Sequence, residues 1–286
     1  MSKYQLTAMV YNSKEQIEAI LSLERQCKQY EQISISANIE HLTMEDGDHA
    51  LLCYHDEKLI ALLSWYTADG IQANISGMVD PDYRRQGVFR SLLQRAKEDM
   101  KPLELQTLCC RIPAGSQSGF GFVQSLEASF NRSEYAMRLG HFISNEPRHS
   151  NLRLRLHEPQ DFEFMVHCQS QAFGEPESWS REYLNQTNQP SRSSYIAMLD
   201  DKNVGLIRIN HIDQTTTFIH DFCILPSFQG KGIGQDVLSE AVGILMEEQY
   251  SHIRLSVVTE NEIALNLYLR VGFEVTAENQ YYVSSL

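Results

Sequence analysis

An internal repeat is the feature that most constrains the fold of this chain. Residues 51–93 align with residues 196–238 without a gap, at an offset of 145 residues that places Gly87 on Gly232 and Pro81 on Pro226. This period is the size of a domain and is too long for the unit of a solenoid. Since 286 residues suffice for about two domains, we expect similar domains over 1–146 and 151–286, joined by the polar linker "SNEPRHSN".

Each copy shows the same order of patterns. The apolar runs around "HDEK" in the first copy and "DDKN" in the second are typical of β-hairpins with a charged turn. A further strand then ends in a proline, a glycine-bearing turn follows, and apolar residues recur at helical spacing. A second β run, a second helix and a short last strand complete each copy. The sequence therefore predicts two α+β domains in tandem.

Composition excludes several classes of partner. The formal net charge of -13 argues against nucleic acid, which requires a basic surface. The six cysteines lack C-x-x-C spacing and indicate reduced thiols in a cytoplasmic protein. No signal-peptide pattern and no apolar run of about 20 residues is present, so we expect no membrane association. The histidines at 211, 220 and 252 are too scattered to predict a metal site.

The stretch "FQGKGIGQDVL" places Gly230, Gly232 and Gly234 between a predicted strand and a predicted helix. Unpaired backbone amides and the positive end of the helix dipole make such a turn suitable for an anion, and glycines leave the amides accessible. A glycine-rich loop without a ligand is the alternative. The phosphate motifs of P-loop and Rossmann proteins do not match the residues that follow.

Two ordered motifs carry a resemblance to a known family. "ILPSFQGKGIGQDVL" resembles the acetyl-CoA signature of the GNAT N-acetyltransferase superfamily, and "NEIALNLYLRVGF" resembles a later segment of that family. In the first copy "MVDPDYRRQGVFRSLL" resembles the same signature, with Phe89 at the place of Gly234. The tandem arrangement is similar in layout to the mycothiol synthases.

The resemblance implies that each domain is a mixed, mostly antiparallel sheet flanked by helices, and that acetyl-CoA donates its acetyl group directly to an amine. It also implies that backbone groups of Phe222, Cys223 and Ile224 pair with the pantetheine arm, with an amide near Cys223 or Ile224 facing the thioester oxygen. Asn261 would contact the cofactor arm. The pyrophosphate would bind the amides of Gln229, Gly230, Lys231, Gly232, Ile233, Gly234 and Gln235.

Acetyl transfer needs a base for the amine and an acid for the departing thiolate. Tyr268 matches the family's tyrosine acid; a tyrosine that only packs is the alternative. His220 is the expected base, because strand alternation places it on one face with Phe222, and because imidazole titrates near neutral pH. Asp221, expected on the opposite face, is the second candidate. A structural histidine remains an alternative, and Cys223 is expected to be an inert core thiol.

The first copy lacks these groups. The offset of 145 places Ile75 and Ser76 at the positions of His220 and Asp221, and a two-residue shift later in the chain places Ser125 at that of Tyr268 and Ser118 at that of Asn261. We therefore expect the N-terminal domain to be structural, or to bind acetyl-CoA without turnover, and the C-terminal domain to be catalytic.

The acceptor is predicted only as a small amine. Glu175, Glu177 and Trp179 make a cationic amine one candidate, and a solvated loop is the alternative reading of this segment. A non-catalytic acetyl-CoA-binding module that senses the cofactor or regulates a partner is the alternative to an enzyme.

Overall fold

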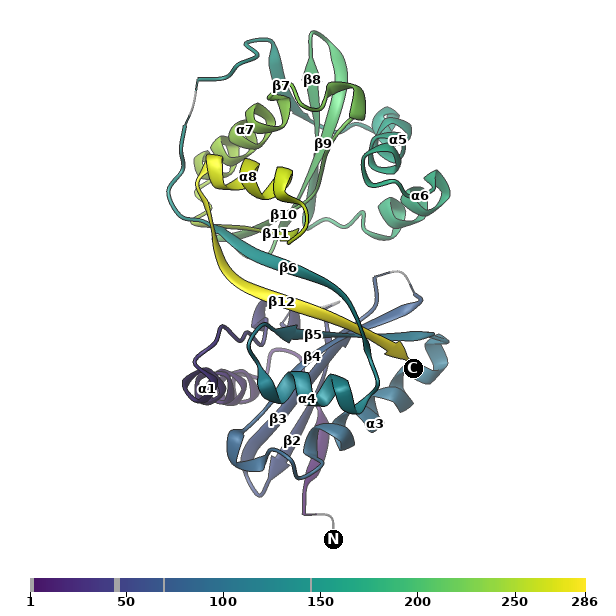
Figure 1. The fold of residues 1–286 in the computed structure, drawn as a ribbon, viewed down its shortest axis with the longest axis vertical. Helices are drawn as coiled ribbons and strands as arrows, with labels where there is room; N and C mark the ends of the chain where they lie inside the picture. Colours follow the sequence, from purple (N-terminus) through teal and green to yellow (C-terminus); the bar gives the residue numbers. More distant parts are fainter. Residues whose placement is uncertain (1–2, 44–46, 69, 145) are drawn as a thin grey trace. The chain divides into compact units, whose positions relative to one another are not determined.

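The computed structural model describes residues 3–43, 47–68, 70–144 and 146–286 and divides the chain into two compact units. The N-terminal unit comprises Met1–Ser133 with Ala277–Leu286, and the C-terminal unit comprises Glu134–Thr276. Each unit contains a mixed sheet flanked by helices (Figure 1). The predicted α+β class with two similar domains is confirmed.

Two strands belong partly to each unit, so the units differ from the sequence ranges 1–146 and 151–286. β6 (Ser129–Leu139) ends the first copy, but its residues 134–138 pair antiparallel with β11 (His252–Val258) in the C-terminal unit. β12 (Phe273–Ser285) ends the second copy, but its residues 279–285 pair antiparallel with β5 (Thr107–Pro113) in the N-terminal unit. The last strand of each copy therefore completes the sheet of the other unit.

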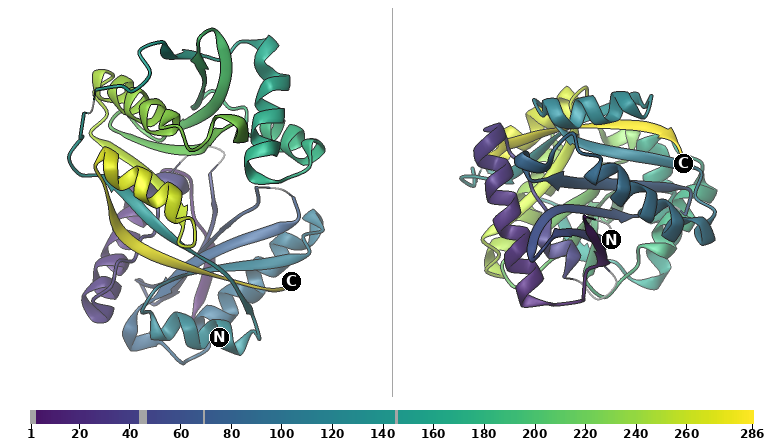
Figure 2. Two further views of the ribbon diagram at one scale, coloured as in Figure 1. Left: turned by 45° about the horizontal axis from the view of Figure 1, so that its top comes forward. Right: turned by 90° about the horizontal axis from the view of Figure 1, so that it is seen from below.

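The sheet of the N-terminal unit has the order β1-β2-β3-β4-β5-β12. Alternating apolar residues cover both faces: Leu51 and Leu63 pack with the cluster under α3 and α4, whereas Leu52 and Leu62 pack under α1. Figure 2 shows these helices around the strands. The remaining bounds are β1 Gln5–Ala8, α1 Lys14–Glu31, α2 Ile39–Leu42, β2 His49–His55, β3 Lys58–Tyr66, β4 Gln72–Val79, α3 Val88–Met100 and α4 Gln117–Ser125.

The sheet of the C-terminal unit has the order β6-β11-β10-β9-β8-β7. Ile207 and Ile219 lie in the core under α7 and α8, whereas Leu206 and Cys223 lie in the core under α5 and α6. The remaining bounds are β7 Leu152–Leu156, α5 Phe162–Phe173, α6 Glu177–Gln186, β8 Arg192–Leu199, β9 Lys202–His211, β10 Thr216–Ile224, α7 Ile233–Glu247 and α8 Glu262–Val271.

Each sheet contains one parallel pair that opens partway along its length. The β4–β5 pairing stops at Ile75 and Cys110, although both strands continue. The β10–β11 pairing stops in the same way at Ile219 and Leu255. The later part of β4 and of β10 therefore has one edge that its parallel neighbour leaves unpaired, which is where a cofactor can add main-chain hydrogen bonds.

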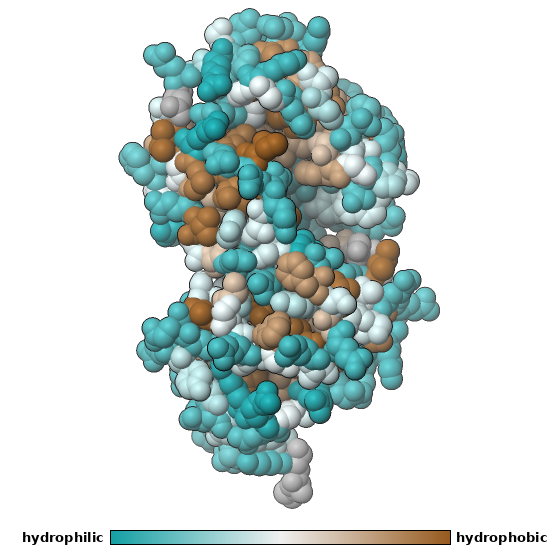
Figure 3. Space-filling view, in the orientation of Figure 1, coloured by the Kyte–Doolittle hydropathy of each residue, from teal (hydrophilic) through white to brown (hydrophobic). Residues whose placement is uncertain are grey.

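The surface is mostly polar on the face shown in Figure 3, with apolar side chains gathered over the region of α7 and α8. Ile263 and Leu269 of α8 are exposed. None of the helices in the described ranges is long and apolar enough to cross a membrane.

Candidate active site

The glycine-rich turn of the C-terminal unit joins β10 to α7. Gln229 closes the end of the strand by donating from Nε2 to the Ile224 carbonyl at 2.8 Å. Gly230 and Gly232 then adopt left-handed φ values of 73° and 86°, and Gly232 is the N-cap of α7. A residue with a Cβ adopts this conformation at a cost, so these two glycines shape the turn that presents the helix N-terminus.

The N-terminal unit builds the same turn with different residues. Arg84 takes the place of Gln229 and donates from Nε to the Val79 carbonyl at 3.0 Å. Arg85 adopts a left-handed φ of 62° where the other copy has Gly230, and Gly87 has a φ of 80° as the N-cap of α3. The backbone geometry of the turn is therefore retained in both copies.

The third glycine has another role, since it permits a close approach of side chains. A Cβ on Gly234 would lie 3.0 Å from Leu267 Cδ1 and 3.8 Å from Phe222 Cζ. In the N-terminal unit the large and small residues are exchanged: Phe89 replaces Gly234, and Gly77 replaces Phe222. A Cβ on Gly77 would overlap the Leu62 carbonyl oxygen and lie 2.6 Å from the Phe89 ring. A Cβ on Gly234 would meet Phe222 only at an ordinary van der Waals distance, so the close fit of glycine against phenylalanine is specific to the N-terminal unit.

The two copies remain in register through the second helix. Asn261 is the N-cap of α8, where its side chain accepts from the Ala264 amide at 3.1 Å. Ser116 is the N-cap of α4 and accepts from the Gly119 amide. The expected two-residue shift is wrong, because the caps keep the offset of 145 and therefore match Asn261 with Ser116 and Tyr268 with the buried Val123. The conclusion that the first copy lacks the tyrosine is unchanged.

Tyr268 lies in the core under α7 and α8 and is 8% exposed. Its ring meets that of Phe273 edge to face, with the centroids 6.2 Å apart. Burial raises the pKa of Tyr268 to about 12, so the phenol keeps its proton at neutral pH. The side chain contributes to packing and can also donate a proton.

A β-bulge brings His220 and Asp221 to the same face of the sheet. The β10–β9 register shifts between His220 and Cys223, and Asp221 adopts a left-handed φ of 46°. The Nδ1 atom of His220 therefore lies 3.0 Å from Asp221 Oδ2, and both face α6, whereas Phe222 packs under α7 and α8. The strand-alternation prediction, with His220 and Phe222 on one face and Asp221 on the other, is wrong for this reason.

Asp221 joins His220 to a buried arginine and a tyrosine. The Nη1 atom of Arg208, a residue only 1% exposed, donates to Asp221 Oδ2 at 2.9 Å. The hydroxyl of Tyr183 donates to the same carboxylate at 3.2 Å. Arg208 also donates to the Thr187 hydroxyl and carbonyl and to Ser194 Oγ. The structure thus places Asp221 behind His220 as its hydrogen-bond acceptor.

The electrostatics of this network fix the protonation states. Burial lowers the pKa of His220 and outweighs the opposite effect of Asp221. Burial alone would raise the pKa of Asp221, but hydrogen bonds and charges from His220 and Arg208 hold it below its usual range. At neutral pH an anionic Asp221 therefore accepts the Nδ1 proton of a neutral His220. The opposite atom, Nε2, is buried and has no hydrogen-bond partner in the described parts of the chain.

Cys223 lies on the same face as His220, and its side chain is buried in the core under α5 and α6. Its Sγ atom lies 3.6 Å from that of Cys168 on α5, and both thiols are free and buried. The hydrogen bond from Cys168 and burial raise the pKa of Cys223 well above its usual value. The thiolate is therefore disfavoured, as expected for an inert core thiol.

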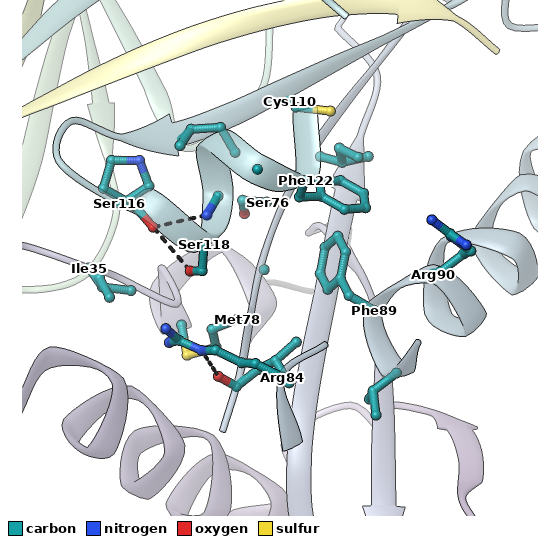
Figure 4. A pocket seen from close by; sticks show the side chains of 18 of the residues that line it. Ile35, Ser76, Met78, Arg84, Phe89, Arg90, Cys110, Ser116, Ser118 and Phe122 are labelled. Carbon is teal, nitrogen blue, oxygen red and sulfur yellow. Dashed lines mark hydrogen bonds between the residues drawn. The ribbon is translucent and has the colours of Figure 1, made fainter. Parts of the chain in front are cut away.

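The N-terminal unit contains a cavity of about 430 Å³ where β4 and β5 separate. Figure 4 shows Phe89 and Phe122 in its wall, with Ser76, Ser116 and Ser118 nearby. Arg84, Arg85, Arg90 and Arg111 also line it, together with Glu31, which pairs with Arg84. The lining therefore carries an excess of positive charge in an acidic chain. No lining side chain corresponds to His220 or Tyr268, since Ile75 and Val123 hold those positions.

Glu175, Glu177 and Trp179, the residues expected to recognise the acceptor, lie on α6 or just before it. Oε1 of Glu177 lies 3.0 Å from Nδ1 of His167, and the ring of Trp179 stacks on that of Tyr183 with the centroids 5.1 Å apart. The sequence reasoning missed Tyr183 and Arg208; the signal for Arg208 was an arginine inside the apolar run "VGLIRIN". Among the described residues, no group of His, Cys, Asp and Glu side chains could hold a metal ion.

The family follows from a sequence comparison. The model of the acetyltransferase (GNAT) family matches residues 17–114 and 159–273, so the chain belongs to this family. The N-alpha-acetyltransferase RimI of Mycobacterium tuberculosis is 28% identical over 127 residues, which cover 43% of this chain and 78% of that protein. Two other curated relatives are matched over only 36% and 39% of their own lengths.

Solved structures share the whole fold. A GCN5-related N-acetyltransferase from Sphaerobacter thermophilus has a TM-score of 0.78 at 21% identity, with 100% of this chain and 96% of that chain covered. A tandem GNAT protein from the clavulanic acid biosynthesis pathway has a TM-score of 0.69 at 14% identity, with 99% and 98% covered. At these identities the likeness establishes the fold, and it confirms the tandem GNAT arrangement.

Proposed function

We propose that the C-terminal unit transfers an acetyl group from acetyl-CoA directly to an amine, without an acyl-enzyme. The observation that carries this proposal is the His220–Asp221 pair with a free, buried Nε2 atom, located immediately after the end of the β10–β11 pairing. A neutral imidazole oriented by a carboxylate is suited to act as a general base. The M. tuberculosis relative is named for acetylation of amines, which supports the reaction class.

The cofactor would bind along the open edge of β10 and at the glycine turn. Backbone groups of Phe222, Cys223 and Ile224 would pair with the pantetheine arm. The amides from Gln229 to Gln235 would hold the pyrophosphate, because they surround the N-terminus of α7. Asn261 is bonded to the Ala264 amide, so its contribution to the cofactor arm would be indirect, through the start of α8.

In this reaction the base, His220, and the acid, Tyr268, come from opposite faces of the C-terminal sheet. His220 Nε2 takes a proton from the acceptor amine, and the nitrogen attacks the thioester carbonyl. An amide near Cys223 or Ile224 stabilises the negative oxygen of the tetrahedral intermediate. The carbon–sulfur bond then breaks, and Tyr268 donates its proton to the departing thiolate.

The experiment is acetyl transfer by the purified chain to a panel of small amines, followed by thiol release and by mass spectrometry of the product. Turnover in the wild type and its loss in His220→Gln, with acetyl-CoA binding retained in calorimetry, are expected. Binding of acetyl-CoA without turnover of any amine would instead support the non-catalytic sensor or regulatory module.

A second function is favoured for the N-terminal unit, namely binding of acetyl-CoA without turnover. The observation is the 430 Å³ cavity with its arginine lining beside a retained turn. Arginine side chains suit the phosphates of coenzyme A, whereas the absence of a base and an acid at Ile75 and Val123 leaves no route for the reaction.

The free thiols of all six cysteines fit a cytoplasmic location for the protein.

A further inference from the structure

Arg192 lies on the face of the C-terminal sheet that carries His220. It is the first residue of β8 and pairs across strands with Asn210 of β9, which in turn pairs with Phe218 of β10. The next row on the same face consists of Ser194, Arg208 and His220. Since rows on one face are about 7 Å apart along a strand, a long arginine side chain at position 192 can reach the region beside His220.

Two nitrogen atoms of the Arg192 guanidinium lack a hydrogen-bond partner among the described residues. Its Nε and Nη1 atoms are buried and form no hydrogen bond, and no carboxylate of the described residues forms an ion pair with it. Arg208, one strand away, shows the contrast, because its donors are used by Asp221, Thr187 and Ser194. Arg192 is therefore not part of the structural ion pair.

Two neighbouring groups are unpaired in the same way. The Oδ1 atom of Asn210 and the Nε2 atom of His220 are both buried without a hydrogen bond. Arg192, Asn210 and His220 are half-buried residues whose unpaired polar atoms are shielded from water. Leaving such atoms without partners is costly, so three of them on one face indicate a binding site. The guanidinium supplies the charge that such a site would neutralise with an anion.

We propose that the acceptor amine of the C-terminal unit carries a carboxylate close to the amine, that Arg192 binds this carboxylate, and that Asn210 hydrogen-bonds the acceptor between Arg192 and His220. The proposal rests on the proposed acetyl transfer and specifies its substrate class. Burial lowers the pKa of His220 and raises that of Tyr183, and the charge of Arg192 makes a smaller, lowering contribution to both, as expected for a cation near both side chains. A purely cationic acceptor, expected from Glu175 and Glu177, would be repelled by this arginine.

The test compares acceptors that differ only in one group, namely amino acids and the corresponding amino acid amides. We expect the wild type to prefer the free carboxylate by about 10-fold to 100-fold in kcat/KM, the range for loss of a charged hydrogen bond. Arg192→Gln should remove this preference while it retains turnover of the amides, and Arg192→Lys should retain part of the preference. Arg153→Gln, which alters an exposed arginine paired with Asp201, is the matched control.

Equal turnover of acids and amides by the wild type, or an unchanged preference in Arg192→Gln, would overturn the assignment. Failure of both acceptor series while other small amines are acetylated would overturn the proposed substrate class, and failure of every amine with intact acetyl-CoA binding would overturn the proposed function instead. In that case calorimetry with N-acetyl amino acids and their amides, in the presence of coenzyme A, still tests whether Arg192 binds a carboxylate. Tighter binding of the acids by the wild type than by Arg192→Gln supports the site, and equal binding excludes it.

Discussion

His220 Nδ1 and Asp221 Oδ2 lie 3.0 Å apart, although consecutive residues of a regular strand point to opposite faces. The left-handed conformation of Asp221 turns its carboxylate back toward the preceding histidine. The pair fixes the imidazole tautomer, with the proton on Nδ1 and the lone pair on Nε2. The bulge therefore creates the candidate base, and the residues of this network give the first two predictions.

The pH dependence should identify His220 as the base. Burial lowers its pKa below the ordinary value of about 6.5, so the active neutral form should persist at pH 6.5 and be lost as the pH falls through the lowered pKa. We expect the ratio of kcat/KM between the wild type and His220→Gln to fall over this acidic range. The ratio cancels the ionisation of the acceptor amine, and a ratio independent of pH would exclude His220 as the titrating base.

Asp221→Asn should destabilise the C-terminal unit. The substitution leaves Arg208, whose side chain is 2% exposed, without its counter-ion, and breaking a buried pair typically costs about 3–5 kcal/mol of unfolding free energy. Urea unfolding at neutral pH measures this loss. Because the pKa of Asp221 is lowered in the folded chain, the stabilisation exists above the unfolded value near 4 and disappears as the pH falls through the folded value.

The control for this substitution is Asp201→Asn, because Asp201 forms an exposed pair with Arg153. Such surface pairs contribute less than about 1 kcal/mol. Equal destabilisation by the two substitutions would mean that the buried network does not stabilise the unit.

Tyr268→Phe should lower kcat about 100-fold or more, in line with the usual contribution of general acid catalysis. The ring remains to pack against Phe273, so acetyl-CoA binding and the melting temperature should change little. Steady-state kinetics and calorimetry separate the two effects. Tyr195→Phe, at a second tyrosine that is also 8% exposed, is the control, and a similar loss of kcat in both variants would assign Tyr268 to packing.

Gly232→Ala should weaken acetyl-CoA binding. Gly232 has a φ of 86°, and an added Cβ would lie 2.9 Å from Arg148 Cδ at the N-terminus of α7. Strain of the turn should lower the stability by about 1 kcal/mol. The matched change Gly243→Ala, inside α7 with no atom within 4 Å of the added Cβ, should raise the stability by about 0.5–1 kcal/mol; calorimetry and thermal unfolding distinguish the two.

Two molecules of acetyl-CoA per chain are expected in calorimetry if the N-terminal cavity binds the cofactor. Arg85→Gln removes one positive charge from the cavity lining and should weaken one of the two binding events several-fold, while kcat of the C-terminal unit is unchanged. A stoichiometry of one in the wild type would show that the N-terminal unit is structural.

The sequence by itself determined the duplication, the α+β class and the position of both turns. These properties depend on local patterns that survive divergence: Gly87 and Gly232 occupy the same left-handed N-cap position, and the apolar alternation specifies the strands. The loss of the base from the first copy was also readable, because the offset of 145 places Ile75 at the position of His220. In the structure Ile75 pairs with Trp65 in a regular register without a bulge.

The tertiary structure alone decided which side chains meet. The exchange of β6 and β12 between the units depends on strand pairing over long distances in the chain, which no local pattern encodes. The bulge at Asp221 reversed the expected side of one carboxylate, because a single left-handed residue shifts the register of everything that follows. Arg208 and Arg192 look alike in the sequence, as isolated basic residues in or beside apolar strands. Only the folded chain shows that Arg208 is paired with Asp221 and that Arg192 has buried nitrogen atoms without a partner in the described ranges.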